Sequence, residues 1–327
     1  MKILAHLHCY PPKKLGGGTI CMALVLEQLA LKGHETQVII PEKYRHNAEA
    51  GKFNGVKVDI TSQNEFGPYY SWADIVLTQL AITPEAVECA KRHQKPLACY
   101  IHSHYYVKAF GLTPKNTTLI IFNSKWMQKY CRWSGDSIVI PPPIIPENYK
   151  TIKGKAITLI NLLPNKGSHL FYKLAGHMPE RKFLGVKGTR GKQHIPAKIP
   201  ANVEIMEPTT DMKSVYEKTG ILLMPSRFRG LEYPEWTESW GRCAIEAAWS
   251  GIPTIAHPCP GLLESLNSAG IFCDRDKPED WINAVRRLDD PHYYEMKSKQ
   301  AKIRAENYDY KVYVNLLEKK LLSIICK

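Results

Sequence analysis

The chain has 327 residues, 44 % of them hydrophobic, which is enough to bury the cores of two domains of ordinary size. It carries 44 Lys and Arg against 31 Asp and Glu, and the resulting formal charge of +13 favours an anionic partner or surface. The apolar runs are far shorter than the ~20 residues that span a bilayer, so we expect no transmembrane segment. Nine scattered cysteines without C-x-x-C pairs argue against a disulfide framework or a zinc site. No signal peptide is recognisable, and we predict a cytoplasmic protein.

In the first half of the chain, apolar strand-like runs alternate with helix-like segments. Helices are expected near residues 19–32 and 84–93. The expected strands are 3–8, 37–40, 75–78, 97–102 and 119–122. This alternation predicts βαβ units around a parallel sheet.

Three consecutive prolines at 141–143, followed by Pro146, interrupt this pattern. Such a segment is stiff and extended, which suits a linker between domains. The alternation then resumes, with strands expected at 157–162, 182–185, 203–206, 221–224 and 254–256, and helices near 169–178, 213–218 and 241–250. Residues 278–288 and 291–326 are expected to form terminal helices. The fold class is therefore α/β, with two Rossmann-like domains, residues 1–145 and 146–305, and a last helix in 306–327.

Two carboxylates, Glu238 and Glu246, bracket Gly241 at the start of a small-residue helix. Glycine lets the backbone approach a ligand closely, and a helix beginning there directs free N–H groups at an anion such as a diphosphate. Glu246 then accepts two hydrogen bonds from a vicinal diol such as a ribose. Two solvated glutamates on a surface helix are the alternative. The buried strand before Ser226 and the helix end before Pro253 favour a nucleotide-sugar site.

The glycines 16–18 fall between the first strand and the first helix, where backbone amides are able to bind a phosphate or a sugar. They form neither the G-x-G-x-x-G fingerprint nor the Walker Gly-Lys-Ser/Thr ending, which disfavours a dehydrogenase or a P-loop nucleotidase. A loop selected only for flexibility is the alternative.

Two further side chains follow predicted strands. His102 ends an apolar strand, at the edge of a parallel sheet where ligands bind, although a structural histidine is the commoner case. Lys166 precedes a helix of the second domain, where an ammonium neutralises a leaving diphosphate; an exposed lysine is the alternative. No acid or thiolate stands at metal-ligand spacing from His102 and His104, so no metal is predicted.

Taken in order, these landmarks resemble the GT-B retaining glycosyltransferases of family 4, over residues 1 to about 275. The strongest part of the resemblance is strand, Pro225-Ser226, the two glutamates, then Gly251-x-Pro253. Weaker landmarks occur in the family's order: Tyr10-Pro-Pro with Gly16-Gly17-Gly18, Lys32-Gly33-His34, His102, Asn123-Ser124, Ile140-Pro141, Pro164-Asn165-Lys166-Gly167 and Gly261-Leu-Leu-Glu264.

The resemblance implies two domains facing across a cleft and a C-terminal helix that crosses back to the first. It implies a UDP- or GDP-linked sugar as the donor, a hydroxyl acceptor, retention of the anomeric configuration and no metal. It assigns catalytic roles to Glu238, His102 and Lys166. It assigns donor binding to Gly16, Gly17, Asn161, Lys166, Arg227, Gly241, Arg242 and Glu246.

One position departs from the family pattern. The family commonly has an arginine, a second cation on the diphosphate, where this chain has Asn161, and asparagine cannot supply that charge. Arg227, Arg229 or Arg242 is expected to substitute, or leaving-group stabilisation is weaker. Asp274-Arg275-Asp276 is similar to the D-x-D that holds Mn²⁺ in the other large glycosyltransferase fold, but its place before Lys-Pro-Glu predicts a turn that opens a helix.

The acceptor is predicted from charge. Residues 89–135 contain no acidic side chain but many aromatic ones, and a second basic stretch runs over 181–198. Both are either solvated faces or a polyanion site, with Lys108, Lys125, Lys129, Arg132 and Arg190 as acceptor-binding candidates.

Three functions follow. The first is transfer to a saccharide or lipid-linked glycan, with peripheral contact to anionic lipid headgroups. The second is glycosylation of hydroxymethylated pyrimidines in DNA. The third, prompted by Asn161, is a non-catalytic nucleic-acid or glycan binder on a GT-B scaffold. Retention of Glu238, Glu246 and Lys166 argues against the third.

Overall fold

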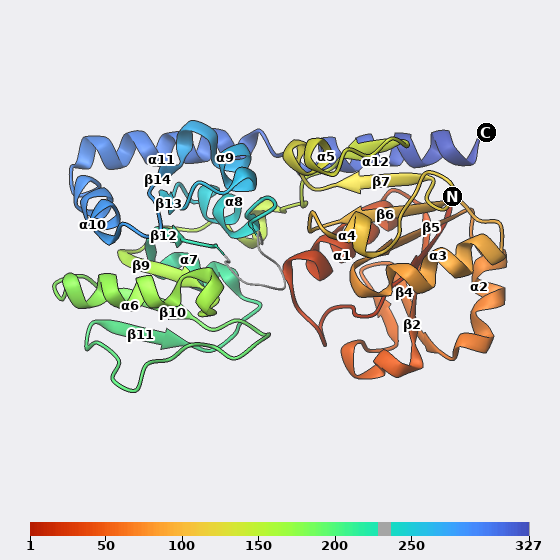
Figure 1. The fold of residues 1–327 in the computed structure, drawn as a ribbon, viewed down its shortest axis with the longest axis horizontal. Helices are drawn as coiled ribbons and strands as arrows, with labels where there is room; N and C mark the ends of the chain where they lie inside the picture. The colour runs from red at the N-terminus through yellow and green to blue at the C-terminus, as the bar shows by residue number, and fades with distance from the viewer. Residues whose placement is uncertain (228–236, 327) are drawn as a thin grey trace. The chain divides into compact units, whose positions relative to one another are not determined.

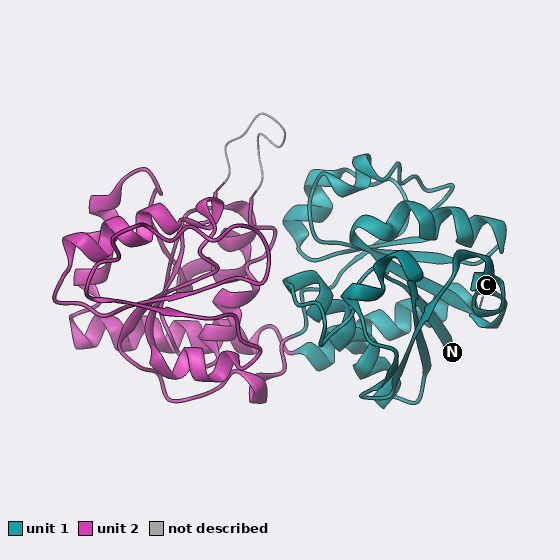
Figure 2. Cartoon of the chain, turned by 90° about the horizontal axis from the view of Figure 1, so that it is seen from below, with its two compact units in different colours: residues 1–143, 310–327 teal, residues 144–309 magenta. Residues whose placement is uncertain are grey.

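The computed structural model describes residues 1–227 and 237–326 (Figure 1). They form two compact units, coloured separately in Figure 2. The first unit contains Met1–Pro143 and Tyr310–Lys327, and the second contains Ile144–Asp309. The chain passes from one unit to the other inside the proline-rich segment and returns between Asp309 and Tyr310.

The first unit is built on an eight-stranded sheet in the order β3-β4-β2-β1-β5-β6-β7-β8. All neighbours are parallel except β3, which is antiparallel to β4. The strands are β1 Lys2–His6, β2 Glu35–Pro41, β3 Gly51–Phe53, β4 Val56–Thr61, β5 Ile75–Gln79, β6 Leu97–Ile101, β7 Leu119–Phe122 and β8 Ser137–Val139.

Helices cover both faces of this sheet, because successive residues of each strand point to opposite sides. Ile3 of β1 packs in one buried cluster, with α1 and α12, and Leu4 packs in the other, with α2, α3 and α5. The helices are α1 Gly17–Leu31, α2 Phe66–Trp72, α3 Thr83–Arg92, α4 Tyr106–Ala109, α5 Lys125–Cys131 and α12 Tyr310–Ile325. Val314, Leu317 and Leu321 of α12 are buried with α1, so the last helix packs on the first unit, as the resemblance implied.

The second unit is built on a six-stranded parallel sheet in the order β11-β10-β9-β12-β13-β14. The strands are β9 Ala156–Ile160, β10 Phe183–Val186, β11 Val203–Met206, β12 Thr219–Met224, β13 Thr254–Ala256 and β14 Ile271–Phe272. The helices are α6 Ser168–His177, α7 Met212–Lys218, α8 Arg242–Ala248, α9 Pro260–Leu266, α10 Pro278–Arg287 and α11 Pro291–Glu306. The predicted α/β class with two parallel sheets is confirmed.

Local chemistry explains where several helices begin. The Ser124 hydroxyl accepts a hydrogen bond from the Met127 amide, and Asp211 and Asp290 cap α7 and α11 in the same way. Proline stands in the first turn of α9, α10 and α11, where its missing N–H costs no hydrogen bond. The terminal segment 291–326 forms two helices, α11 and α12, and the residues between them carry the chain back to the first unit.

Candidate functional site

The turns after β9 and β12 meet at the carboxyl edge of the second unit's sheet. Lys166 ends the short 3-10 turn Pro164–Lys166 after β9, and its ammonium forms an ion pair with the carboxylate of Glu238. Their side chains are only 22 % and 13 % exposed. The structure thus brings together the predicted diphosphate cation and the predicted sugar contact.

Gly167 permits this approach. Its φ is +97°, and a Cβ there would lie 2.3 Å from Cγ of Pro225, in the segment after β12. Any other residue would be strained and would push the Lys166 turn away from that segment. The Lys166 turn is therefore held against Pro225 by close packing at Gly167.

Glu246 lies one turn into α8 and is 4 % exposed. Its Oε1 accepts a hydrogen bond from Nε of Arg242 at 2.5 Å, and its Oε2 accepts one from the Tyr216 hydroxyl at 2.8 Å. Arg242 also donates to the Tyr149 hydroxyl at 2.7 Å. These charge-assisted bonds offset the cost of burying the carboxylate.

The two tyrosines stay protonated at neutral pH. Burial, and then the charge of Glu246, raises the pKa of Tyr216 well above its usual value, and the same two causes raise the pKa of Tyr149. Each phenol is therefore a hydrogen-bond donor. Neither was predicted, because both stand far from Glu246 in the sequence and no local pattern connects them to it.

Gly241 precedes α8 with a φ of +87°, and a Cβ there would lie 2.3 Å from Cδ2 of Leu262 in α9. Both the backbone conformation and the space require glycine. The helix begins at Arg242, one residue later than predicted, and ends at Ala248, before the predicted end at residue 250.

The departure at Asn161 has a conformational reason. Its φ is +74°, a region that asparagine tolerates better than arginine does. Its backbone N–H donates to the Val186 carbonyl at 2.8 Å. Its side-chain Oδ1 is buried without a hydrogen bond from the described residues. A side chain at Gly188 would collide with it, at 2.5 Å from Oδ1. Asn161 therefore fits a tight turn.

Two of the expected replacement cations already have carboxylate partners. Nη2 of Arg227 binds both oxygens of Asp276, at 2.5 and 2.6 Å, and Arg242 binds Glu246. Arg229 lies outside the described residues. Asp274–Asp276 forms the predicted turn before α10. No group of three or more His, Cys, Asp or Glu side chains in 1–227 and 237–326 is arranged to hold a metal.

In the first unit, the glycine loop and His102 lie together. Gly16 has an extended backbone, and α1 begins at Gly17. A Cβ at Gly18 would lie 3.1 Å from the His102 ring. The predicted phosphate or sugar loop and the predicted sugar-facing histidine thus belong to one local site.

His102 is held in a neutral state. Its Nε2 is 2.8 Å from Oε1 of Gln79, and its ring stacks on Tyr100 with a centroid distance of 4.5 Å. Burial lowers the pKa of His102 to about 4. Since the amide oxygen accepts, we assign the proton to Nε2, which leaves Nδ1 as the acceptor nitrogen. Gln79 was not predicted, although its place at the carboxyl end of β5, beside β6, was the signal for it.

The aromatic residues of the first basic stretch also gather. The ring centroids of His104 lie 6.0 Å from Trp126 and 5.1 Å from Tyr130, and those of Trp126 and Tyr130 are 5.3 Å apart. Tyr130 is 47 % exposed. The exposed cations of this part of the unit are Lys108 on α4, Lys125 and Lys129 on α5, and Arg132 after it. We call these residues the α4–α5 surface.

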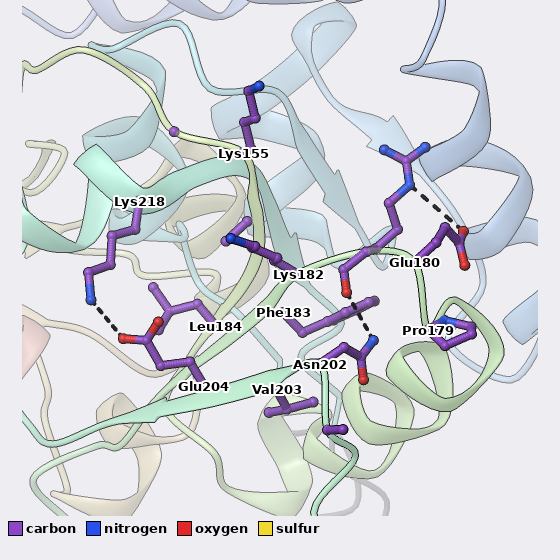
Figure 3. Close-up of a pocket in the computed structure, with 14 residues that line it drawn as sticks. Lys155, Pro179, Glu180, Lys182, Phe183, Leu184, Asn202, Val203, Glu204 and Lys218 are labelled. Carbon is purple, nitrogen blue, oxygen red and sulfur yellow. Dashed lines mark hydrogen bonds and ion pairs between the residues drawn. The ribbon is translucent and has the colours of Figure 1, made fainter.

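The second basic stretch is divided between the two ends of β10, so it does not form the one continuous polyanion site that the sequence offered. Arg181 and Lys182 precede β10, whereas Arg190 follows it, so they lie at opposite ends of the strand. Arg181 and Lys182 line a cavity of about 830 Å³ at the amino edge of the sheet, together with Lys155 and Lys218 (Figure 3). Lys218 pairs there with Glu204 at 2.7 Å.

Comparison with known proteins agrees with this architecture. Residues 156–290 match the family described as glycosyl transferases group 1. A stretch of 85 residues is 34 % identical to D-inositol 3-phosphate glycosyltransferase of Corynebacterium kroppenstedtii, and it spans 25 % of this chain and 17 % of that protein.

Solved structures extend the likeness to the whole chain. HepE of Anabaena, in complex with UDP-glucose, is 16 % identical with a TM-score of 0.77, covering 99 % of this chain and all of the other. Sucrose-phosphate synthase of Thermosynechococcus elongatus is 14 % identical with a TM-score of 0.75, covering both chains fully. A trehalose-6-phosphate synthase is 10 % identical with a TM-score of 0.66, over 98 % and 99 % of the two chains.

At these identities the structural likeness establishes the fold, which is GT-B. The family match lies within the second unit, over residues 156–290, and there the chain is similar to the group 1 glycosyl transferases. None of the helices within 1–227 and 237–326 has the length and apolar character to cross a membrane.

Proposed function

We propose that this enzyme transfers a sugar from a UDP-linked donor to a hydroxyl of an anionic acceptor, with retention of anomeric configuration. The observation that carries the proposal is the Lys166–Glu238 ion pair beside the buried Glu246, at the ligand-binding edge of the second unit's sheet. The UDP-glucose complex of HepE supports UDP as the nucleotide.

Glu246 is the proposed ribose ligand. An ionised carboxylate offers about four acceptor positions, and Arg242 and Tyr216 use one on each oxygen. A ribose diol is thus able to donate to the remaining positions without displacing either partner. Because these partners fix the carboxylate, little conformational freedom is lost when the donor binds.

Lys166 and Glu238 are proposed to exchange partners when the donor binds. In the free protein each neutralises the other, which keeps two partly buried charges paired. A donor supplies a diphosphate for the ammonium and sugar hydroxyls for the carboxylate. As the glycosidic bond breaks, negative charge builds on the diphosphate, and Lys166 stabilises that charge.

The reaction proposed is front-face substitution. No carboxylate of 1–227 and 237–326 is an evident nucleophile at this site, so the departing phosphate oxygen takes the proton of the acceptor hydroxyl as the new glycosidic bond forms. The neutral His102 and the backbone at Gly16 and Gly17 are proposed contacts of the donor sugar and phosphate. None of these roles calls for a metal ion.

The acceptor proposal rests on the α4–α5 surface. Its exposed lysines and arginine, with the aromatic rings beside them, suit an anionic acceptor such as a charged saccharide or a lipid-linked glycan. DNA carrying hydroxymethylated pyrimidines is the second candidate for the same charges.

The test is a transfer and hydrolysis screen of UDP- and GDP-sugars. Each donor is incubated alone, with anionic vesicles containing a lipid-linked glycan, and with hydroxymethylated duplex DNA. We expect turnover of a UDP-sugar, its loss in Glu238→Ala, survival in EDTA, and a product whose anomeric proton coupling matches the donor's. Absence of binding or turnover of every nucleotide sugar would refute the proposed function, and Mn²⁺-restored activity after EDTA would refute the metal-free mechanism.

A further inference from the structure

The turn Asp274–Asp276, which the chemistry above does not use, is built rigidly into the second unit. The Asp276 amide donates to Oδ1 of Asp274 at 3.1 Å, and the indole N–H of Trp281 donates to the Asp274 carbonyl at 2.8 Å. Trp281 is fully buried in the core. These bonds fix the conformation of the turn and therefore the position of its middle residue.

Its middle residue, Arg275, reaches the Lys166 turn. Nη1 donates to the carbonyls of Asn165 at 3.0 Å and of Arg227 at 2.7 Å, and Nη2 donates to the carbonyl of Pro164. One guanidinium thus joins the 3-10 turn after β9 to the segment after β12. The Arg227 amide completes this junction with a bond of 2.8 Å to the Asn165 carbonyl.

A planar group with five fixed donors suits this task, and a lysine does not. The carbonyls that Arg275 binds belong to the two residues just before Lys166 and to Arg227, which follows β12. Losing the guanidinium would remove one donor from each of these carbonyls and loosen the turn. The ties that remain are the Arg227 amide bond to the Asn165 carbonyl and the packing of Gly167 on Pro225.

We propose that Arg275 is a positioning residue that fixes the Lys166 ammonium where the diphosphate develops charge. This inference rests on the proposed function of Lys166. Arg275 acts through the backbone of the Lys166 turn and does not itself touch the donor.

The main experiment is a double-mutant cycle with Arg275→Met, Lys166→Ala and the double variant. A misplaced catalytic group costs roughly tenfold to a hundredfold in rate, so Arg275→Met should lower kcat by that factor and change the UDP dissociation constant by less than about threefold. If Arg275 acts through Lys166, the double variant is no slower than Lys166→Ala alone. Additive losses would overturn the proposal.

A matched control lies at the opposite edge of the same sheet. Nδ2 of Asn202 also lies within hydrogen-bond distance of three backbone carbonyls, those of Ala175 and Met178 at 3.0 Å and of Arg181 at 2.9 Å, and its two N–H groups are shared among them. Figure 3 shows Asn202 among the residues that line the amino-edge cavity. Asn202→Ala should lower thermal stability as Arg275→Met does, but leave kcat unchanged. An equal fall in kcat for both would indicate a merely structural role.

Hydrogen exchange separates this inference from the proposed function, because it needs no substrate. The amides of Lys166 and Gly167 bond to the carbonyls of Leu163 and Pro164. Arg275→Met should raise the exchange rate of these two amides about tenfold or more, measured against amides that exchange only by global unfolding. Asn202→Ala should not raise it. Unchanged exchange would overturn the inference even in an active enzyme. Faster exchange in a protein that turns over no nucleotide sugar would instead refute the proposed function alone.

Discussion

The edge of the second unit and the α4–α5 surface of the first handle charge in opposite ways. At the edge, three cations have acidic partners: Lys166 with Glu238, Arg242 with Glu246, and Arg227 with Asp276. The α4–α5 surface belongs to a stretch, residues 89–135, without any acidic side chain. Paired and partly buried charges suit exchange with one small ligand of fixed geometry. Exposed excess charge suits an extended anion and weakens as salt increases.

The largest effect is expected at the paired edge. Lys166→Ala should lower kcat roughly a hundredfold to a thousandfold, as removal of one donor to a developing oxyanion does, with a much smaller rise in the donor dissociation constant. Single-turnover rates and calorimetric UDP titrations measure the two quantities. Lys155→Ala, at the amino edge of the same sheet, is the control. A loss explained entirely by weaker donor binding would contradict the assigned role.

The next effect concerns the α4–α5 surface. Reversing Lys125, Lys129 and Arg132 to glutamate removes three cations, so the slope of log affinity against log salt for an anionic partner should fall by about three. Donor binding should stay unchanged, because the donor contacts are assigned elsewhere. The control reverses three exposed lysines of the second unit, Lys173, Lys213 and Lys299.

The same salt titration is run with anionic vesicles and with DNA, and the result distinguishes between the proposed acceptors. Binding to anionic vesicles but not to DNA would favour a membrane-surface acceptor. Tight DNA binding without transfer to a hydroxymethylated base would leave the non-catalytic binder. Unchanged affinity for both anions in the reversed variant would contradict the whole role of this surface.

A smaller effect is expected at Glu246. A hydrogen bond to a charged group contributes roughly 1.5–3 kcal/mol, so Glu246→Gln should weaken donor binding about tenfold to a hundredfold. The exposed Glu204, changed to Gln, is the control. Tyr216→Phe should weaken binding in the same direction but less, since it removes one neutral donor that orients the carboxylate. If Glu246→Gln bound the donor with wild-type affinity, the assignment of Glu246 as the ribose ligand would be wrong.

The sequence predicted the parts of this comparison that depend on local pattern. Alternating apolar runs gave the two α/β units, and the ordered motifs gave Lys166, Glu238 and Glu246 as site candidates. Positions such as the carboxyl end of a parallel strand are readable because the strand itself fixes where its last side chains lie.

Side-chain partners that come from distant segments could not be predicted from the sequence. Tyr216 reaches Glu246, and Tyr149 reaches Arg242, only through the tertiary fold. Asp276 neutralises Arg227 only because β14 and β12 share one sheet. The basic stretch at 181–198 looked continuous, yet β10 divides it between two edges. Short edge strands such as β3 and β8 were also missed, because three residues carry too little periodicity.

Acid should affect the first unit through His102. Its pKa falls from the ordinary 6.5 to about 4 on burial, so the unfolded chain binds more protons between these values. This group's contribution to stability is therefore complete above pH 6.5 and is lost as the pH falls toward 4. His6 has a pKa lowered by burial too and acts in the same direction.

The measurement is the melting temperature from pH 7 to 4, in wild type, His102→Gln and the control His177→Gln at an exposed site. His102→Gln should lose part of the acid sensitivity, and His177→Gln should keep all of it. Equal acid sensitivity in wild type and His102→Gln would contradict the buried neutral state.

The smallest change in activity is expected at Asn161, where two opposing effects are separable. Arginine at a φ of +74° costs roughly 1–2 kcal/mol, so Asn161→Arg should lower the melting temperature by a few degrees, whereas Asn161→Gly should not. The added guanidinium should leave kcat unchanged or raise it modestly if Arg227 or Arg242 already serves the diphosphate. Both arginines are paired with carboxylates in the free protein. To bind the diphosphate, either one must exchange its carboxylate partner when the donor binds. A large gain in kcat would show that neither makes this exchange and that the natural enzyme works with Lys166 as its main diphosphate cation.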